Sequence, residues 1–279
     1  MAETGHCATL WQKMAQRLGL DAVFIPGDWR HGADAQAIGA VLLVDTISSL
    51  GSIDYRVDDW GVDVTVAGSQ KGLMLPPGLS FNSISDKALA AAKLARLPRS
   101  YWEWSEMLSS NRTGYFPYTP ATNLLYGLDE AIKMLLEEGL DNVFAHHARH
   151  AEATRAAVRG WGLEILCLEP AEYSNALTAV VMPEGHDADR LRELILQRYD
   201  MSLGAGLAKL KGTVFRIGHL GDFNDLTLMG TLAGVEMGLA GAGVPHRTGG
   251  VRAAMDCLSS PAADASAPIP IRTRTAQAA

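Results

Sequence analysis

The stretch VLLVDTISSLGSIDYRVDDWGVDVTVAGSQKGLMLPPGLSF, residues 41–81, contains two apolar runs that each end in a polar segment. The first run, VLLVD, ends at Asp45, and the second, VDVTVAG, covers residues 62–68. Short runs of continuous apolar character are typical of strands that are buried on both faces. We therefore predict two strands here, with Asp45 at the end of one and the turn GSQKG after the other.

Alternating strand-like and helical patterns continue on both sides of this stretch. Before it, the sequence predicts a helix at 10–18, a short strand at 22–25 and a weak helix at 33–38. After it, helical patterns cover 121–138, 142–159, 188–199 and 225–239, and strand-like runs are LEILCL, ALTAVVM and VFRIGHL. Strands that alternate with helices favour an α/β domain with a mostly parallel sheet. The later segments predict a smaller α+β layer.

Composition and charge exclude several classes of protein. The chain has 279 residues and a formal net charge of −7, without a block of lysine and arginine, which argues against a nucleic-acid surface. No apolar run approaches the roughly 18 residues of a membrane span, and the N-terminus lacks the pattern of a secretory signal. The cysteines, Cys7, Cys167 and Cys257, are far apart and include no CxxC pair. We therefore expect reduced thiols in a cytoplasmic protein.

Lys71 lies in the turn GSQKG, and the segment Pro-Pro-Gly follows it closely. In open α/β sheets, ligands bind beyond the C-terminal ends of the strands. A solvent-exposed loop lysine is the commoner outcome for this residue type. The alternative is a partly desolvated lysine, whose amine gives up its proton more easily and attacks an aldehyde.

Asp45 has three possible roles: a helix N-cap, a metal ligand, or the partner of a pyridinium nitrogen. Pyridoxal phosphate (PLP) requires a lysine at its aldehyde carbon and an acid at its ring nitrogen. The acid keeps the nitrogen protonated, so that the ring can accept electrons. Asp45 and Lys71, each at the end of a predicted strand, would provide both groups.

The whole segment 41–81 resembles the cofactor segment of class V, fold-type I PLP-dependent aminotransferases, and above all the serine–glyoxylate and alanine–glyoxylate aminotransferase family. The similarity continues in ETGHCATLWQKMAQRLG, in GYFPYTPATNLLYGLDEAI and in MSLGAGLAKLKGTVFRIGHLGDFN, so that it covers nearly all of residues 3–258. It implies a PLP-binding large domain at 1–120, a connecting helix at 121–140 and a small C-terminal domain at 141–258. Residues 259–279 are rich in Ala, Ser and Pro without periodicity, which predicts a disordered tail.

The resemblance implies a role for each residue that matches a family motif. Lys71 would form the Schiff base with the cofactor and then move the substrate's α-proton. Asp45 would pair with the ring nitrogen, Ile47 and Trp11 would contact the two faces of the ring, and Gln70 would hydrogen-bond the phosphate.

Three further residues concern the substrate and a second subunit. Arg216 would hold the substrate carboxylate, because its guanidinium group matches a carboxylate in a bidentate pair. Without the resemblance, a strand-end arginine in solvent or in a structural ion pair is the slightly better interpretation. Thr119, with Tyr118 as a weaker candidate, would reach the phosphate of a neighbouring subunit, which implies a homodimer. The implied activity is transamination from serine or alanine to glyoxylate, giving glycine and a 2-oxo acid.

Two segments of the family pattern have no match in this sequence. The family has a small-residue loop before ETGHCATLW, which binds the phosphate at a helix N-terminus, and a strand and helix between the positions of Ala40 and Val41. We therefore expect a shortened large-domain sheet and weak PLP binding. Two alternatives remain open: a truncated, non-catalytic relative that pairs with a full-length subunit, and a lyase or desulfurase on the same fold. A desulfurase would need a reactive cysteine in a mobile loop, and none of the three cysteines lies in such a segment.

Three histidines, His146, His147 and His150, lie close together on the predicted helix 142–159. His146 and His150 are four residues apart, a spacing at which two histidines can share a metal ion. No third ligand is evident, and the segment is not HExxH, so we expect a solvated helix face. His219, three residues after Arg216, is a weak candidate for the border of the substrate site.

Overall fold

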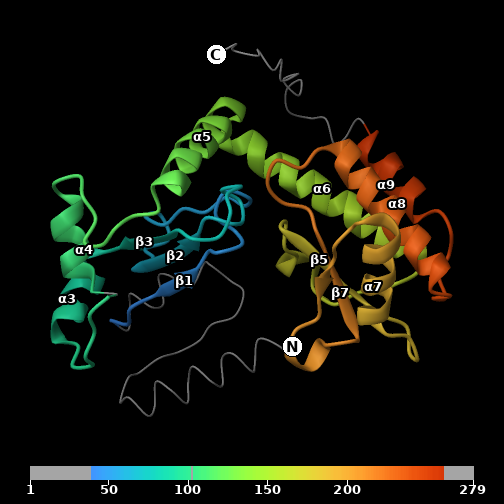
Figure 1. Ribbon diagram of the computed structural model, residues 1–279, viewed down its shortest axis with the longest axis horizontal. Coiled ribbons are helices and arrows are strands. Elements are labelled where there is room, and N and C mark those ends of the chain that lie inside the picture. The colour runs from blue at the N-terminus through green and yellow to red at the C-terminus, as the bar shows by residue number, and fades with distance from the viewer. Residues whose placement is uncertain (1–38, 102, 261–279) are drawn as a thin grey trace. The chain divides into compact units, whose positions relative to one another are not determined.

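The computed structural model describes residues 39–101 and 103–260 (Figure 1). These residues form two compact units. The first unit comprises residues 39–47, Tyr55–Ser69 and Pro76–Leu128. The second comprises Ser48–Asp54, Gln70–Leu75 and residues 129–260. The predicted elements at 10–18, 22–25 and 33–38, as well as Cys7, Trp11 and all of the tail after residue 260, lie outside the described residues.

The first unit contains a sheet of three strands in the order β1-β2-β3. Strand β1 (Leu43–Asp45) runs parallel to β2 (Val64–Gly68), and β2 runs antiparallel to β3 (Ser80–Ile84). Val64 and Ala67 of β2 are buried, as the apolar sequence predicts for a central strand. The two predicted strands are thus confirmed. The expected burial on both faces is wrong for β1, where Leu43 and Asp45 are exposed, and the described sheet has one parallel and one antiparallel pairing instead of a mostly parallel order. Strand β3 was not predicted, because SFNSI has an exposed, mostly polar pattern.

Helices α3 (Asp86–Leu94) and α4 (Trp104–Asn111) follow the sheet in the first unit. Ser85 caps α3, since its side-chain oxygen accepts the backbone N–H of Ala88, and Glu103 caps α4 in the same way. Helix α5 (Thr122–Glu138) confirms the helix predicted at 121–138. Its residues up to Leu128 belong to the first unit, and the rest belong to the second.

The second unit combines four antiparallel strands with long helices, which confirms the predicted α+β layer. Its strands, in the order β4-β5-β7-β6, are β4 (Glu164–Ile165), β5 (Leu177–Val181), β6 (Gly204–Ala205) and β7 (Val214–Gly218). Its helices are α6 (Leu140–Trp161), α7 (Ala188–Tyr199), α8 (Asp225–Gly241) and α9 (Gly250–Leu258), with short 3₁₀ turns at Pro170–Glu172 and Ala208–Leu210.

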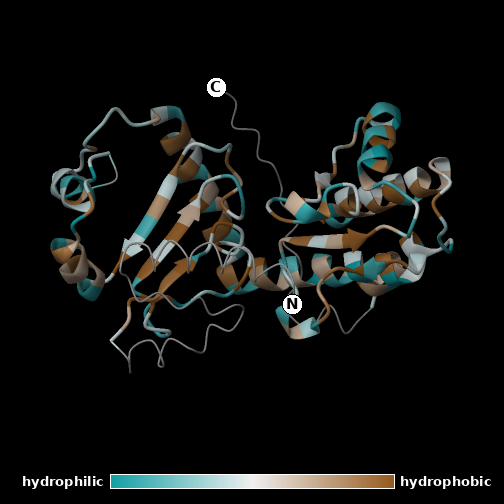
Figure 2. Cartoon of the chain, turned by 90° about the horizontal axis from the view of Figure 1, so that it is seen from below, coloured by the Kyte–Doolittle hydropathy of each residue, from teal (hydrophilic) through white to brown (hydrophobic). Residues whose placement is uncertain are grey.

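The core of the second unit lies between this sheet and the helices. Hydrophobic residues occupy the strands and the inner helix faces (Figure 2). Trp161 at the end of α6 is buried, and its indole N–H donates to Glu236 of α8 at 2.8 Å. Gly250 is needed where α9 approaches α6, because a Cβ there would lie 2.3 Å from the indole nitrogen of Trp161. This core supports β7, the strand that carries Arg216.

Among the helices between residues 39 and 260, none combines the length and the apolar character that a membrane span requires.

Candidate active site

Asp45 lies at the C-terminal end of β1, where it is paired with Val66 of the parallel strand β2. Its side chain is exposed, and its Oδ1 accepts the backbone N–H of Ile47 at 2.8 Å. The next residue, Thr46, is fully buried and donates its hydroxyl to the carbonyl of Val66 at 3.0 Å. The carboxylate is therefore held in a fixed orientation at the edge where the parallel strands end, while Oδ2 has no hydrogen-bond partner among residues 39–101 and 103–260.

The loop after β2 is closed at its base by Ser69, which is fully buried. The backbone N–H of Ser69 donates to the carbonyl of Leu79 at 3.1 Å, and its hydroxyl donates to the carbonyl of Pro76 at 2.8 Å. The same hydroxyl oxygen accepts the N–H of Leu79 at 3.2 Å. One side chain thus fixes both ends of the segment that contains Lys71.

Lys71 itself is half-buried, and its amine has no hydrogen bond or ion pair to any residue in the described ranges 39–101 and 103–260. Its carbonyl accepts the N–H of Met74 at 2.9 Å, which forms a tight turn. Gly72, the residue after the lysine, is buried against the segment 48–54. A Cβ on Gly72 would lie 2.1 Å from the carbonyl oxygen of Leu50. A glycine follows the lysine because a neighbouring backbone fills the space of any side chain.

Arg216 is the middle residue of β7 and is paired with Ala179 of β5 and Gly204 of β6. Its Nε donates to the carbonyl of Ala205 at 2.8 Å. Gly204 leaves room for it, since a Cβ there would lie 3.0 Å from the Cβ of Arg216 and 3.2 Å from its Nε. No carboxylate of the described chain pairs with Arg216, so the interpretation as half of a structural ion pair gains no support. The two terminal NH₂ groups have no hydrogen-bond partner in the part of the chain that the structure describes.

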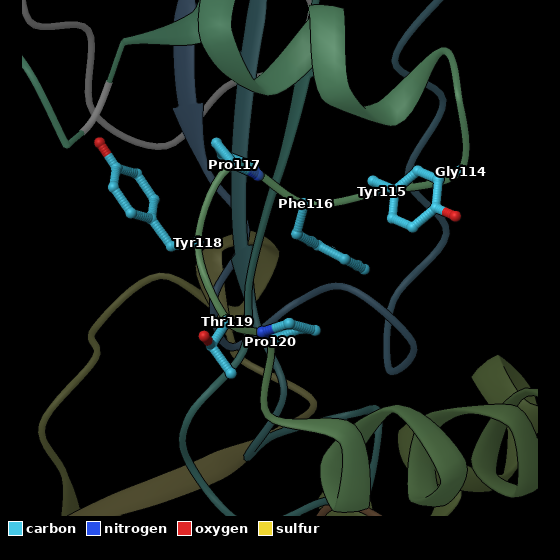
Figure 3. A pocket seen from close by; sticks show the side chains of 7 residues that line it. All are labelled: Gly114, Tyr115, Phe116, Pro117, Tyr118, Thr119 and Pro120. Carbon is cyan, nitrogen blue, oxygen red and sulfur yellow. The ribbon is translucent and has the colours of Figure 1, made fainter.

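The other predicted contacts within the described residues lie in three separate segments. Ile47 is half-buried beside Asp45, and Gln70 is exposed in the loop after β2. Tyr118 and Thr119 belong to the loop 114–120, whose residues line an open pocket. In this loop, the side chains of Tyr115 and Tyr118 point to opposite sides (Figure 3). The ring of Tyr118 lies 4.9 Å from that of Tyr101, and its side chain is 43% exposed. The roles of these residues remain predictions.

The prediction that the histidines of α6 form a solvated face is wrong. His147 and His150 are buried, with 2% and 1% of their surface exposed. The segment after β7 covers them: Gly221 donates its N–H to Nε2 of His147 at 3.1 Å, and His150 Nε2 lies 2.9 Å from Oδ1 of Asp225. The ring of His146 lies between the carboxylate of Glu138 and the carbonyl of Phe223.

Burial and hydrogen bonds shift the pKa values of the three histidines in different directions. Burial lowers the pKa of His147, and it lowers the pKa of His150 to about 4. Burial also disfavours the charged form of His146, but the hydrogen bonds to Glu138 and to the Phe223 carbonyl outweigh it, so that the pKa of His146 is raised. Arg149 holds the pKa of Asp225 at about 2. Within the described part of the chain, no group of three or more His, Cys, Asp or Glu side chains could hold a metal ion.

His219 is fully buried at the end of β7. One ring nitrogen lies 3.1 Å from the carbonyl of Asn175, and the other lies 3.0 Å from the hydroxyl of Thr178. Burial lowers the pKa of His219 to about 4. Both ring nitrogens are thus engaged within the chain, and the expectation that His219 borders the substrate site stays a prediction.

Comparisons with known proteins match this chain over most of its length. The sequence pattern of the family Aminotransferase class-V matches residues 30–212. The serine–glyoxylate aminotransferase of Methylorubrum extorquens is 42% identical over 92% of this chain and 76% of the relative. The L-aspartate–glyoxylate aminotransferase of Paracoccus denitrificans is 38% identical over 91% of this chain and 75% of the relative. The chain therefore spans about three quarters of the length of these two relatives.

Solved structures match as well. The ureidoglycine–glyoxylate aminotransferase from Bacillus subtilis has a TM-score of 0.77 at 23% identity, over 91% of this chain and 69% of that one. The pyridoxamine–pyruvate aminotransferase from Mesorhizobium loti has a TM-score of 0.75 at 34% identity, over 81% and 59% of the two chains. The first match establishes the fold, and the second adds similarity in sequence.

The groups described above fit the cofactor of such enzymes. The amine of Lys71 has no other partner among the described residues, and neither does one carboxylate oxygen of Asp45, so each group by itself has the chemistry that such a cofactor requires. The terminal NH₂ groups of Arg216 suit the carboxylate of an amino acid. On its sequence, its fold and these groups, the chain belongs to the class V aminotransferase family, the PLP-dependent enzymes of fold type I.

Proposed function

We propose that this protein transfers the amino group of a small amino acid, serine or alanine, to glyoxylate, giving glycine and a 2-oxo acid. Two similar relatives carry glyoxylate in their names, with serine and aspartate as donors, which supports glyoxylate as the acceptor. The single observation that carries the proposal is the half-buried amine of Lys71, which has no partner in the described chain and lies in a turn fixed on both sides.

PLP, when bound, supplies an aldehyde that condenses with amines and a ring that stores the electron pair of the substrate's Cα. Lys71 would hold the cofactor at its aldehyde carbon and would take the proton from the substrate's Cα. An amine serves as a base only when it is neutral and close to the proton that it removes. The turn between Lys71 and Met74, which the hydrogen bond at 2.9 Å closes, limits the positions of that amine.

Asp45 would keep the ring nitrogen protonated through Oδ2, the carboxylate oxygen that has no partner among the described residues. The hydrogen bond from the N–H of Ile47 holds the other oxygen, so the carboxylate loses little conformational freedom on binding. We propose that Ile47 and Trp11 contact the two faces of the ring and that Gln70 hydrogen-bonds the phosphate. Trp11 lies outside the described residues.

Arg216 binds the carboxylate of the donor and later that of glyoxylate. Its Nε bond to Ala205 fixes the plane of the guanidinium group. A fixed plane favours bidentate binding, which orients the Cα–H bond of the substrate toward the base.

The enzyme acts as a homodimer in this proposal, because Thr119, with Tyr118 as the weaker candidate, completes the phosphate site of the neighbouring subunit. The exposed aromatic side chains of this part of the first unit, with Tyr115 at 72% and Tyr126 at 76% exposure, support a partner surface there. We place the enzyme in the cytoplasm.

The activity is tested with purified full-length protein, PLP and ¹³C-labelled glyoxylate. Serine, alanine and aspartate are supplied in turn, and labelled glycine is measured by mass spectrometry. We expect glycine with serine or alanine, loss of the product in Lys71→Ala, and retention in Lys209→Ala, which changes an exposed lysine of the second unit. Absence of labelled glycine with every donor would contradict the proposal and favour the non-catalytic alternative.

A further inference from the structure

Met74 has a backbone conformation that side chains rarely adopt, with a φ of 61°. Only glycine reaches this left-handed region without strain, so another residue stays there only when its surroundings hold it. The N–H of Met74 donates to the carbonyl of Lys71 at 2.9 Å. The strained residue therefore closes the turn that presents the lysine.

The side chain of Met74 reaches the segment after β7. A Cβ placed on Gly221, whose φ is +90°, would lie 3.5 Å from Cγ of Met74, which is van der Waals distance. Gly221 in turn donates its N–H to Nε2 of His147 at 3.1 Å. All three residues belong to the second unit.

His147 fixes this contact from the interior of α6. Its Nδ1 lies 2.7 Å from the carbonyl of Val143, which can only accept, so Nδ1 carries the proton. Nε2 then has a free electron pair, as the N–H of Gly221 requires. The side chain is 2% exposed.

Little free space separates these groups. Met74, Gly221 and His147 line a common cavity of about 10 Å³, together with Leu135 and Val143. This volume is no more than a single water molecule needs. A shift of the glycine or of the imidazole therefore reaches Met74.

We propose that His147 and Met74 are positioning residues for the reactive lysine: the imidazole holds Gly221, Gly221 supports the side chain of Met74, and Met74 holds the turn at Lys71. The catalytic importance of Lys71 rests on the function proposed above. The series of contacts that connects His147 to Lys71 is independent of that function. These contacts connect Gly221, in the segment after β7, to the turn between Lys71 and Met74.

The test measures the accessibility of the lysine without cofactor. Full-length protein free of PLP is acetylated briefly under native conditions, and the labelling rate of Lys71 is divided by that of the exposed Lys209 through mass spectrometry. His147→Leu removes the acceptor of the Gly221 N–H, and we expect the ratio to rise about threefold or more as the turn opens locally. His147→Gln can still present an acceptor near the position of Nε2, and we expect it to keep the wild-type ratio.

The matched control is Thr154→Val. Thr154 is also buried on α6 and also binds the carbonyl four residues earlier, that of His150, at 2.9 Å, but it does not line the cavity beside Met74. We expect this variant to lose stability without a change in the labelling ratio. A general loosening of α6 would instead raise the ratio in both variants, which would overturn the proposal.

Met74→Ala tests the link independently of the imidazole. It removes the side chain that meets Gly221, so we expect the same rise in the ratio, and the double variant with His147→Leu should rise no further than Met74→Ala alone. An unchanged ratio in folded Met74→Ala, or additive effects in the double variant, would overturn the proposal. Since no PLP is present, these results stand apart from the proposed transamination: absent glycine production would refute the activity and leave the link intact.

Discussion

Gly72 lies against the backbone of Gly51: a Cβ on Gly72 would be 2.8 Å from the carbonyl carbon of Gly51 and 2.1 Å from the oxygen of Leu50. Real Cβ atoms essentially never come this close to backbone atoms, so a side chain at position 72 must push two backbone segments apart. The residue before Gly72 is Lys71. The packing of two loop segments therefore limits where the amine of Lys71 can lie.

Gly72→Ala is accordingly expected to destabilise the protein by roughly 1–3 kcal/mol, as overpacking of a tight site does. We also expect it to weaken PLP binding, because Lys71 moves with the turn. Urea unfolding and a PLP titration measure the two effects. The control is Gly230→Ala, where nothing lies within 4 Å of the new Cβ on α8 and where we expect about 0.5–1 kcal/mol of stabilisation. Equal stability of the Gly72→Ala variant and the wild type would show that the two segments separate easily.

Ser69→Ala removes the hydroxyl that closes the base of the loop. It eliminates the bond to the Pro76 carbonyl and leaves the buried N–H of Leu79 without the Ser69 oxygen as its acceptor. We expect a loss of about 1–3 kcal/mol in the free energy of unfolding. Ser83→Ala, at an exposed position of β3, should stay within about 0.5 kcal/mol of the wild type. Similar values for the two variants in urea unfolding would contradict the closing role of Ser69.

Arg216→Lys keeps the positive charge but loses the planar fork and the Nε bond to Ala205. Charge-assisted hydrogen bonds contribute roughly 1.5–3 kcal/mol, so we expect kcat/KM for the donor to fall by about 10- to 100-fold. PLP affinity should stay near that of the wild type, since the proposed function assigns Arg216 to the substrate and not to the cofactor. A variant that loses PLP and activity together would place Arg216 in the cofactor site or in the fold instead.

The free energy of unfolding should decrease as the pH is lowered, because His150 and His219 are buried in the neutral form. Their pKa values are about 4 in the folded chain and 6.5 in the unfolded chain, so the unfolded chain binds more protons between these limits. Stability is therefore present above pH 6.5 and is lost as the pH falls toward 4, by at most about 3 kcal/mol per histidine. The raised pKa of His146 acts in the opposite direction, since its contribution is present at low pH and is lost as the pH rises.

Urea unfolding at pH 7.5, 6 and 5 measures this dependence. His219→Gln removes one titrating group, so its stability should decrease less between pH 7.5 and 5 than that of the wild type. An identical pH dependence in the variant would mean that the pKa of His219 is the same in the folded and in the unfolded chain, which would contradict this account. Measurements between pH 8 and 9, where neither histidine titrates, serve as the control.

The sequence was sufficient for the elements with a strong apolar pattern. VLLVD and VDVTVAG gave β1 and β2, and the helix predicted at 188–199 has the same bounds as α7. Helices α3 and α4 were missed because they bury almost nothing, with Ala88 as the buried residue of α3. Helix α9 was missed because it begins at a glycine and depends on its close packing against α6. Local patterns cannot reveal such long-range contacts.

The residues of the candidate site also divide into those that a local sequence pattern predicts and those that depend on contacts in the folded chain. Asp45 and Lys71 are predictable because each follows an apolar strand and matches a family motif. The role of Gly72 depends on a close approach to Leu50 and Gly51, and that of Ser69 on hydrogen bonds to Pro76 and Leu79 across a loop. No local pattern in the sequence marks either residue. The histidines of α6 were misjudged for a related reason: a polar side chain can be buried when its partners come from a segment more than 70 residues away, as Gly221 and Asp225 do here.

The central claim is that Lys71 binds PLP covalently. Its direct test is to add PLP to purified full-length protein, reduce with borohydride and locate the modified residue by mass spectrometry. The account predicts a near-visible absorption band before reduction, a single pyridoxyl group on Lys71, and the loss of both in Lys71→Ala. Modification spread over exposed lysines such as Lys209, or an unchanged band in Lys71→Ala, would contradict it.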